Sequence, residues 1–206
     1  MGPQVHHDTV AAAVFRIIDR DGVAAATLPC VAREADLPSE EVRQYFSDAK
    51  ELLVFVREVV YTRLSQRLDH HTPAIIDTDP SLTRDERRAA LENSLAQFLP
   101  LDEERRRDAK VWLACSVHAT DQPELEPEIH FFPQSMRKGF PEAFAAAQEA
   151  GVVAEDLDTA VETERLAALL DGLTLNGLLH PEIMPPEAML AVLRRHLDSL
   201  RPADSG

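Results

Sequence analysis

Residues 22–53 read GVAAATLPCVAREADLPSEEVRQYFSDAKELL and contain the most informative structural pattern in the chain. Apolar residues recur there at helical spacing in two short segments separated by a tight connection. Thr27 is placed to cap the first segment, and Ser39 to cap the second, which we expect to run from Glu40 to Phe46. A capping box at Asp48 then opens a longer helix. Short helices joined by a tight turn and followed by a long helix predict a helix-turn-helix.

The rest of the chain also carries helical patterns. A first helix is expected to follow Asp8 and Thr9 and to end at Gly22. Residues 72–80 contain two prolines and are predicted to form a loop. Prolines are expected to break or kink residues 122–140, and the only strand-like patch is Val152-Val153. The remaining helices are expected at Leu82 to Pro100, 102–120, 143–150, Leu157 to Leu179, and a last segment carrying Met189 to Leu200. The sequence therefore predicts an all-α protein of about nine helices.

Composition excludes several classes of protein. The 206 residues are 45% hydrophobic, but no stretch approaches the ~20 consecutive apolar residues of a membrane span, so a cytoplasmic protein is expected. Cys30 and Cys115 are the only cysteines, which excludes a disulfide framework. Neither a Cys-x-x-Cys motif nor a Glu-x-x-His pair occurs, so we expect no metal, no cofactor and no enzymatic activity.

The residues around the helix-turn-helix resemble those of a known family. Residues up to about 60 resemble the DNA-binding domain of the TetR family of transcriptional regulators. The remainder resembles that family's ligand-binding and dimerisation domain, particularly the BetI-like subgroup. The first likeness is carried by Gly22, Thr27, Val31-Ala32, Ala35, Leu37, Tyr45-Phe46 and Glu51-Leu52-Leu53, and the second by Leu101 to Arg105, Val111 to Ala114 and Leu169 to Leu173.

The resemblance implies two domains and a set of DNA-binding residues. We expect an N-terminal three-helix helix-turn-helix domain over 1–52, joined by a long helix to a C-terminal ligand-binding and dimerisation domain over 53–206. The third helix would present Arg43, Gln44 and Tyr45 to the major groove, where arginine pairs with guanine and glutamine with adenine. Thr27 would meet phosphates, and Lys50 is also assigned to DNA. On residue type alone, Arg43 and Gln44 are the solvated face of a short helix.

The charge of the chain opposes DNA binding. The formal net charge is −15, and residues 1–68 hold eight basic against ten acidic side chains. Glu40 and Glu41 lie at the positive end of the expected recognition helix, where a phosphate would otherwise bind. A DNA-binding domain ordinarily carries a basic face. These residues motivate an alternative function, a ligand-binding dimer of the same fold with weak or lost DNA binding.

The second domain is expected to hold a small-molecule cavity and a dimer interface. The helices of residues 166–179 and 189–200 offer more apolar surface than one protomer needs, which predicts a homodimer. The leading prediction is a repressor that binds a palindromic double-stranded DNA operator and is released by an unknown small molecule. The residues predicted to line this cavity are Phe98, Trp112, His118, Phe131, Met136, Phe140 and Asn176. Each of them could equally be an ordinary structural residue of the packed interior.

Overall fold

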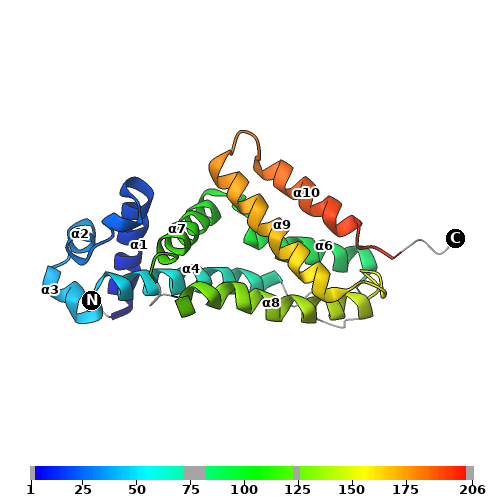
Figure 1. Ribbon diagram of the computed structural model, residues 1–206, viewed down its shortest axis with the longest axis horizontal. Helices are drawn as coiled ribbons and strands as arrows, with labels where there is room; N and C mark the ends of the chain where they lie inside the picture. The colour runs from blue at the N-terminus through cyan, green and yellow to red at the C-terminus, as the bar shows by residue number, and fades with distance from the viewer. Residues whose placement is uncertain (1–2, 72–81, 123–125, 203–206) are drawn as a thin grey trace. The chain divides into compact units, whose positions relative to one another are not determined.

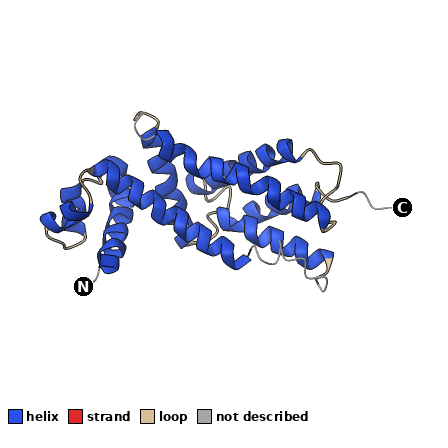
Figure 2. Cartoon of the chain, turned by 90° about the horizontal axis from the view of Figure 1, so that it is seen from below, coloured by secondary structure: helices blue, strands red, loops and turns tan. Residues whose placement is uncertain are grey.

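The computed structural model describes residues 3–71, 82–122 and 126–202, and in them the chain is helical without a β-strand (Figures 1 and 2). This confirms the predicted all-α class. The predicted loop at 72–80 lies outside the described residues. The nine α-helices described are α1 (Pro3–Asp21), α2 (Leu28–Glu34), α3 (Ser39–Tyr45), α4 (Ala49–His71), α6 (Arg84–Leu95), α7 (Glu103–Ala119), α8 (Glu126–Glu149), α9 (Thr159–Leu179) and α10 (Pro186–Asp198), with short 3₁₀ helices at Val23–Ala25 and Ala96–Phe98.

The chain forms two compact units. Unit 1 consists of Met1–Arg63 and Arg107–Phe131, and unit 2 of Leu64–Arg106 and Phe132–Gly206. Helices α4, α7 and α8 each contribute residues to both units. The predicted domains, 1–52 and 53–206, divide the chain elsewhere because they follow a change in sequence pattern, whereas the units follow packing. The division into a DNA-binding domain over 1–52 and a ligand-binding and dimerisation domain over 53–206 therefore stays a prediction.

Unit 1 has a core made by one face of each of its first four helices. The side chains of Val14, Val31 and Leu52 are fully buried there, and fully burying an aliphatic side chain contributes about 1.5–3 kcal/mol. Helix α7 adds Val111 and Cys115 to the same cluster. Each of these four helices therefore turns an apolar face toward the core of unit 1.

Unit 2 has a second core formed by α6, α8, α9 and α10. Its central side chains are aliphatic, apart from Phe140 and Phe144 of α8. The strand-like patch Val152-Val153 is a buried bend after α8 and not a strand. The other buried members of this core include Leu91, Leu95, Leu99, Leu166, Leu170, Leu173, Met189, Leu193 and Leu197.

Two helix predictions differ from the structure. Helix α1 begins at Pro3, several residues before the predicted cap, because proline is tolerated in the first turn of a helix. Residues 122–140 were expected to be broken or kinked; the break is wrong, because one continuous helix, α8, has Pro133 and Pro141 in its interior. Each interior proline removes one backbone hydrogen bond, but α8 buries Phe140 and Phe144 in the core of unit 2, and this packing offsets the loss.

Capping explains where several helices begin. The Asp48 carboxylate accepts from the backbone N–H of Glu51 (2.9 Å), as predicted for the start of α4. The predicted cap Ser39 is instead the first residue of α3 and follows Pro38. A reciprocal capping box between Thr83 and Glu86 starts α6 and was missed, although its Thr-x-x-Glu spacing is visible in the sequence.

Candidate functional site

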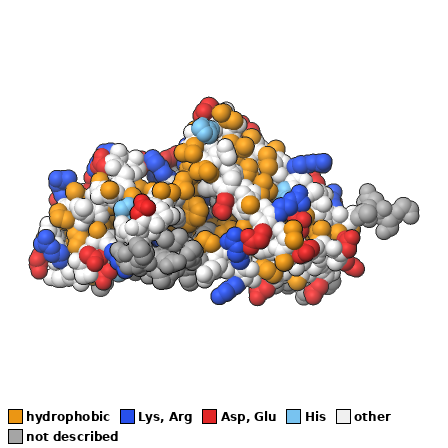
Figure 3. All heavy atoms as spheres, in the orientation of Figure 1, with side chains coloured by type: hydrophobic (Ala, Val, Ile, Leu, Met, Phe, Trp, Pro, Cys, Tyr) orange, Lys and Arg blue, Asp and Glu red, His pale blue; other side chains and the backbone are white. Residues whose placement is uncertain are grey.

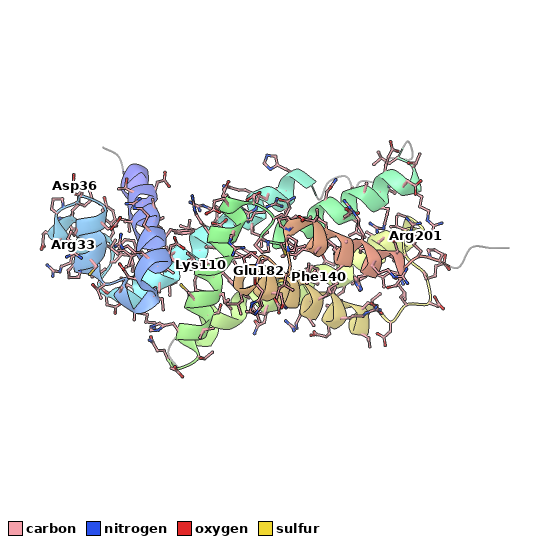
Figure 4. The ribbon with its side chains drawn as sticks, turned by 90° about the horizontal axis from the view of Figure 1, so that it is seen from above. Arg33, Asp36, Lys110, Phe140, Glu182 and Arg201 are labelled. Carbon is pink, nitrogen blue, oxygen red and sulfur yellow. The ribbon has the colours of Figure 1, made fainter. Side chains whose placement is uncertain are left out.

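The connection between α2 and α3 is a Schellman turn. The backbone N–H of Leu37 donates to the carbonyl of Ala32 (2.9 Å), and that of Asp36 donates to the carbonyl of Arg33 (3.3 Å). Asp36 has a φ of 54°, in the left-handed region that aspartate tolerates better than most residues. Figure 4 labels Arg33 and Asp36 at this turn. The turn fixes the angle at which α3 leaves α2, as a helix-turn-helix requires.

Helix α3 turns one face inward and the other to solvent. Val42 is its only fully buried side chain, whereas Glu40, Arg43 and Gln44 are all exposed. Residues three and four apart share a helix face, so Glu40 lies on the same face as Arg43 and Gln44. The structure therefore brings the two predicted base-reading residues together, with a carboxylate beside them.

The other predicted DNA-binding residues lie at the ends of α2, α3 and α4. Tyr45 ends α3 and is 37% exposed, and Lys50 lies half-buried in the first turn of α4. Thr27 is exposed at the N-cap of α2, where its side chain makes no capping hydrogen bond. All five predicted residues thus belong to one unit, on or beside the helix-turn-helix.

Two basic side chains of α1 form ion pairs with acidic side chains. The Glu34 carboxylate accepts from Arg16 Nε (2.7 Å) and from both terminal nitrogens of Arg20 (3.2 Å each). These hydrogen bonds hold the pKa of Glu34 below its usual value. Arg20 also bonds the Asp21 carboxylate (2.9 Å). The arginines of α1 therefore link α1 to α2, and Glu34 neutralises charge that would otherwise attract phosphate.

An aromatic cluster packs against the C-terminal end of α3. The ring of His7 on α1 lies 5.4 Å from Tyr45 in a T-shaped arrangement and 5.2 Å from Phe55 of α4. Phe46 lies 5.1 Å from Phe55 and is buried. Sequence reasoning missed His7 and Phe55, because no spacing rule links a residue of the first helix to residues about 40 positions later.

Helix α7 is tied to α1 and α4 by ion pairs. The buried carboxylate of Asp108 accepts from Arg63 Nη1 (2.9 Å), and the Arg63 guanidinium lies 4.8 Å from the centre of the Phe15 ring. Lys110, labelled in Figure 4, pairs with Asp19 of α1, and this bond lowers the pKa of Asp19. Helices α1 and α4 are thus fastened to α7 by charged as well as apolar contacts.

The predicted ligand-binding residues fall into both units. In unit 2, the rings of Phe98 and Phe140 lie 5.9 Å apart, and Met136 packs against the same core. Figure 4 labels Phe140. Asn176 lies on the exposed face of α9, where its amide donates to the carbonyl of Gly172 (2.8 Å), so it does not join this group.

The remaining three predicted ligand residues belong to unit 1. Trp112 packs against the core of that unit. His118 lies 2.7 Å from the side-chain nitrogen of Gln122 on the same segment. The side chain of Phe131 lies outside the described residues. The ligand-binding role of these three residues stays a prediction.

The described residues contain no candidate metal site, because no cluster of three His, Cys, Asp or Glu side chains in them is placed to hold a metal ion. A surface hollow in unit 2 is lined by Arg84, Arg88 and Arg201, but by none of the predicted ligand-binding residues. Over residues 3–71, 82–122 and 126–202, no helix has the length and hydrophobicity that a membrane crossing requires.

Comparison with known proteins connects this geometry to a family. Residues 87–202, more than half of the chain, match the family described as BetI-type transcriptional repressor, C-terminal. The chain belongs to the TetR family of transcriptional regulators. This TetR-family regulator is 27% identical over 204 residues to the HTH-type transcriptional regulator PksA of Bacillus subtilis, a match that covers 97% of this chain and 94% of PksA.

Solved structures show the same fold. A transcriptional regulator from Rhodococcus is 24% identical with a TM-score of 0.76, and the match covers 94% of this regulator and 95% of that chain. A transcriptional regulator from Saccharomonospora viridis in complex with choline is 20% identical with a TM-score of 0.75, covering 95% and 96% of the two chains. At these identities the structures establish the fold of this TetR-family member.

Proposed function

We propose that this regulator is a repressor that binds a palindromic DNA operator as a homodimer and releases it when a small molecule binds. The observation that carries the proposal is the run of Arg43, Gln44 and Tyr45, exposed together at the end of the second helix of the helix-turn-helix. An arginine and a glutamine on one exposed helix face are the residues that read guanine and adenine.

Exposed apolar side chains support a dimer. Leu175 and Leu179 of α9, Ile183 of the following turn and Val192 of α10 are all exposed, with Leu179 at 59% and Ile183 at 71%. Figure 3 shows hydrophobic side chains gathered along α9 and the turn after it. A two-fold contact through this surface would cover it and supply two recognition helices, which a palindrome with half-sites about 34–36 Å apart requires.

Unit 2 supplies the ligand-binding part of the proposal. The rings of Phe98 and Phe140 contact each other, and Phe98 and Met136 pack against the core of this unit. Aromatic faces bind apolar molecules and also cations, and the Saccharomonospora relative with this fold was solved with choline. A ligand acts as inducer only if it binds the DNA-free conformation more tightly than the DNA-bound one.

A second candidate function is a ligand-binding dimer of the same fold with weak or lost DNA binding. It is favoured by Glu40 on the same face of α3 as Arg43, and by Glu34, which pairs with two arginines of α1. Carboxylates on a DNA-facing surface repel phosphates at low salt.

One experiment separates the two candidates. The purified full chain is incubated with randomised duplex DNA, and the enriched duplex is titrated by fluorescence anisotropy at several salt concentrations. The repressor proposal expects an enriched palindrome, with log affinity falling as log salt rises. It also expects the double substitution Arg43→Ala, Gln44→Ala to abolish specific binding.

A matched control carries the same residue changes elsewhere. Arg84 and Gln134 are exposed in unit 2, and their double substitution to alanine is expected to leave binding unchanged. Absence of enrichment even at low salt would favour the second candidate. Unchanged affinity in the Arg43, Gln44 variant would refute the assignment of these residues to DNA.

A further inference from the structure

Helix α3 is too short to set its own orientation. It has seven residues, its only fully buried side chain is Val42, and its N-cap makes no side-chain hydrogen bond. Helices of this length are not stable in isolation, so contacts at their ends must hold them in place. The Schellman turn fixes the N-terminal end of α3, and the C-terminal end needs a separate anchor.

The aromatic cluster provides that anchor. Tyr45 and Phe46 end α3, and the His7 ring contacts Tyr45 edge-on at 5.4 Å while lying 5.2 Å from Phe55. His7 also lies 6.4 Å from Phe46. This one half-buried ring therefore touches the end of α3 and the start of α4 from α1, so three helices meet at it.

We propose that His7 is a positioning residue for DNA reading, in that its ring sets the rotation of α3 about its own axis. This inference rests on the proposed function. Arg43 and Gln44 directly precede Tyr45, so a rotation that moves Tyr45 also moves both base-reading side chains. Bidentate pairs with bases depend on alignment, whereas phosphate attraction depends mainly on charge.

The two kinds of binding are therefore affected differently. Loss of the ring lowers affinity for the specific duplex and leaves affinity for unrelated duplex nearly unchanged. A residue that merely stabilised the fold would lower both affinities by the same factor, through a smaller folded fraction. The ratio of specific to non-specific affinity is thus the readout that a structural role does not move.

The test uses the full chain, the duplex enriched by the wild-type protein, and a scrambled duplex of equal length. Three variants are compared: His7→Ala removes the ring, His7→Phe keeps a ring, and His7→Leu fills the space without one. His70→Ala, at an exposed histidine of α4, serves as the matched control. Anisotropy gives both affinities, and circular dichroism gives the folded fraction.

His7→Ala is expected to lower the specific affinity about tenfold and the non-specific affinity less than twofold. His7→Phe is expected to restore the ratio to within about threefold of wild type, and His70→Ala to leave it unchanged. If His7→Ala does not fold, the comparison of His7→Leu with His7→Phe decides, with the lower ratio expected for leucine.

Two results would overturn the inference alone: a wild-type ratio in His7→Ala, or equal ratios for the leucine and phenylalanine variants. A wild-type chain that enriches no duplex overturns the proposed function, and the inference with it. The two failures are therefore distinguishable.

Discussion

The ion pair between Asp108 and Arg63 is expected to be energetically asymmetric. The Asp108 side chain is 3% exposed, whereas that of Arg63 is 38% exposed, and their nearest atoms are 2.9 Å apart. Substituting Arg63 with methionine leaves a buried carboxylate without this counter-ion. Substituting Asp108 with asparagine leaves a guanidinium that water can reach and that still lies over the Phe15 ring.

The expected magnitudes follow from this exposure. Breaking a buried pair by removing one partner costs about 3–5 kcal/mol, and the exposure of Arg63 points to the lower end of that range. Arg63→Met is therefore expected to lower the free energy of unfolding by about 3 kcal/mol. Asp108→Asn retains an oxygen acceptor and is expected to cost about 1 kcal/mol. The double variant removes the buried charge and should be more stable than Arg63→Met alone.

Thermal and urea unfolding, followed by circular dichroism at fixed protein concentration, measure these differences. At roughly 2–4 °C per kcal/mol for a chain of this size, Arg63→Met is expected to lower the Tm by about 6–12 °C. The control Arg33→Met, at an exposed arginine, should change the free energy by less than about 0.5 kcal/mol. The reasoning fails if Asp108→Asn costs as much as Arg63→Met, or if the double variant is the least stable of the three.

Three further predictions concern other residues. Burial raises the pKa of the Cys115 thiol to about 11. At pH 8, iodoacetamide should therefore label the half-buried Cys30 in the native protein and label Cys115 only in urea. Rapid labelling of both thiols in the native protein would contradict this. A Cβ at Gly177 would lie 2.8 Å from Met189 Sδ. The cost of overpacking, about 1–3 kcal/mol, outweighs the roughly 1 kcal/mol by which alanine favours a helix over glycine. Gly177→Ala should therefore lower the free energy of unfolding measured in urea. The pKa of Glu34 is lowered in the folded state, so its pairing stabilises the fold above the unfolded pKa of about 4.3, and this stabilisation is lost as the pH falls through the lowered pKa. Glu34→Gln should therefore destabilise the chain at pH 7, and by progressively less as the pH falls below about 4; a pH-independent difference would refute this pairing.

Much of the fold was predictable because its signals are local. Apolar spacing located the helices, and Thr27 and Asp48 marked the starts of α2 and α4. The break expected at the prolines of α8 was wrong, because the cost of an interior proline is local while the burial of Phe140 and Phe144 that offsets it is not. For the same reason, candidate ligand-binding residues could be named from the sequence, but their grouping in space could not.

Local patterns were sufficient to predict the helical class and the helix-turn-helix and to indicate the family, because backbone hydrogen bonding and capping act over a few residues. The folded chain was needed to show that His7 meets Tyr45 and that Asp108 pairs with Arg63. These two contacts join residues 38 and 45 positions apart in the chain. Such contacts depend on the path of the whole chain, which brings distant side chains within a few ångströms and which no short-range pattern specifies.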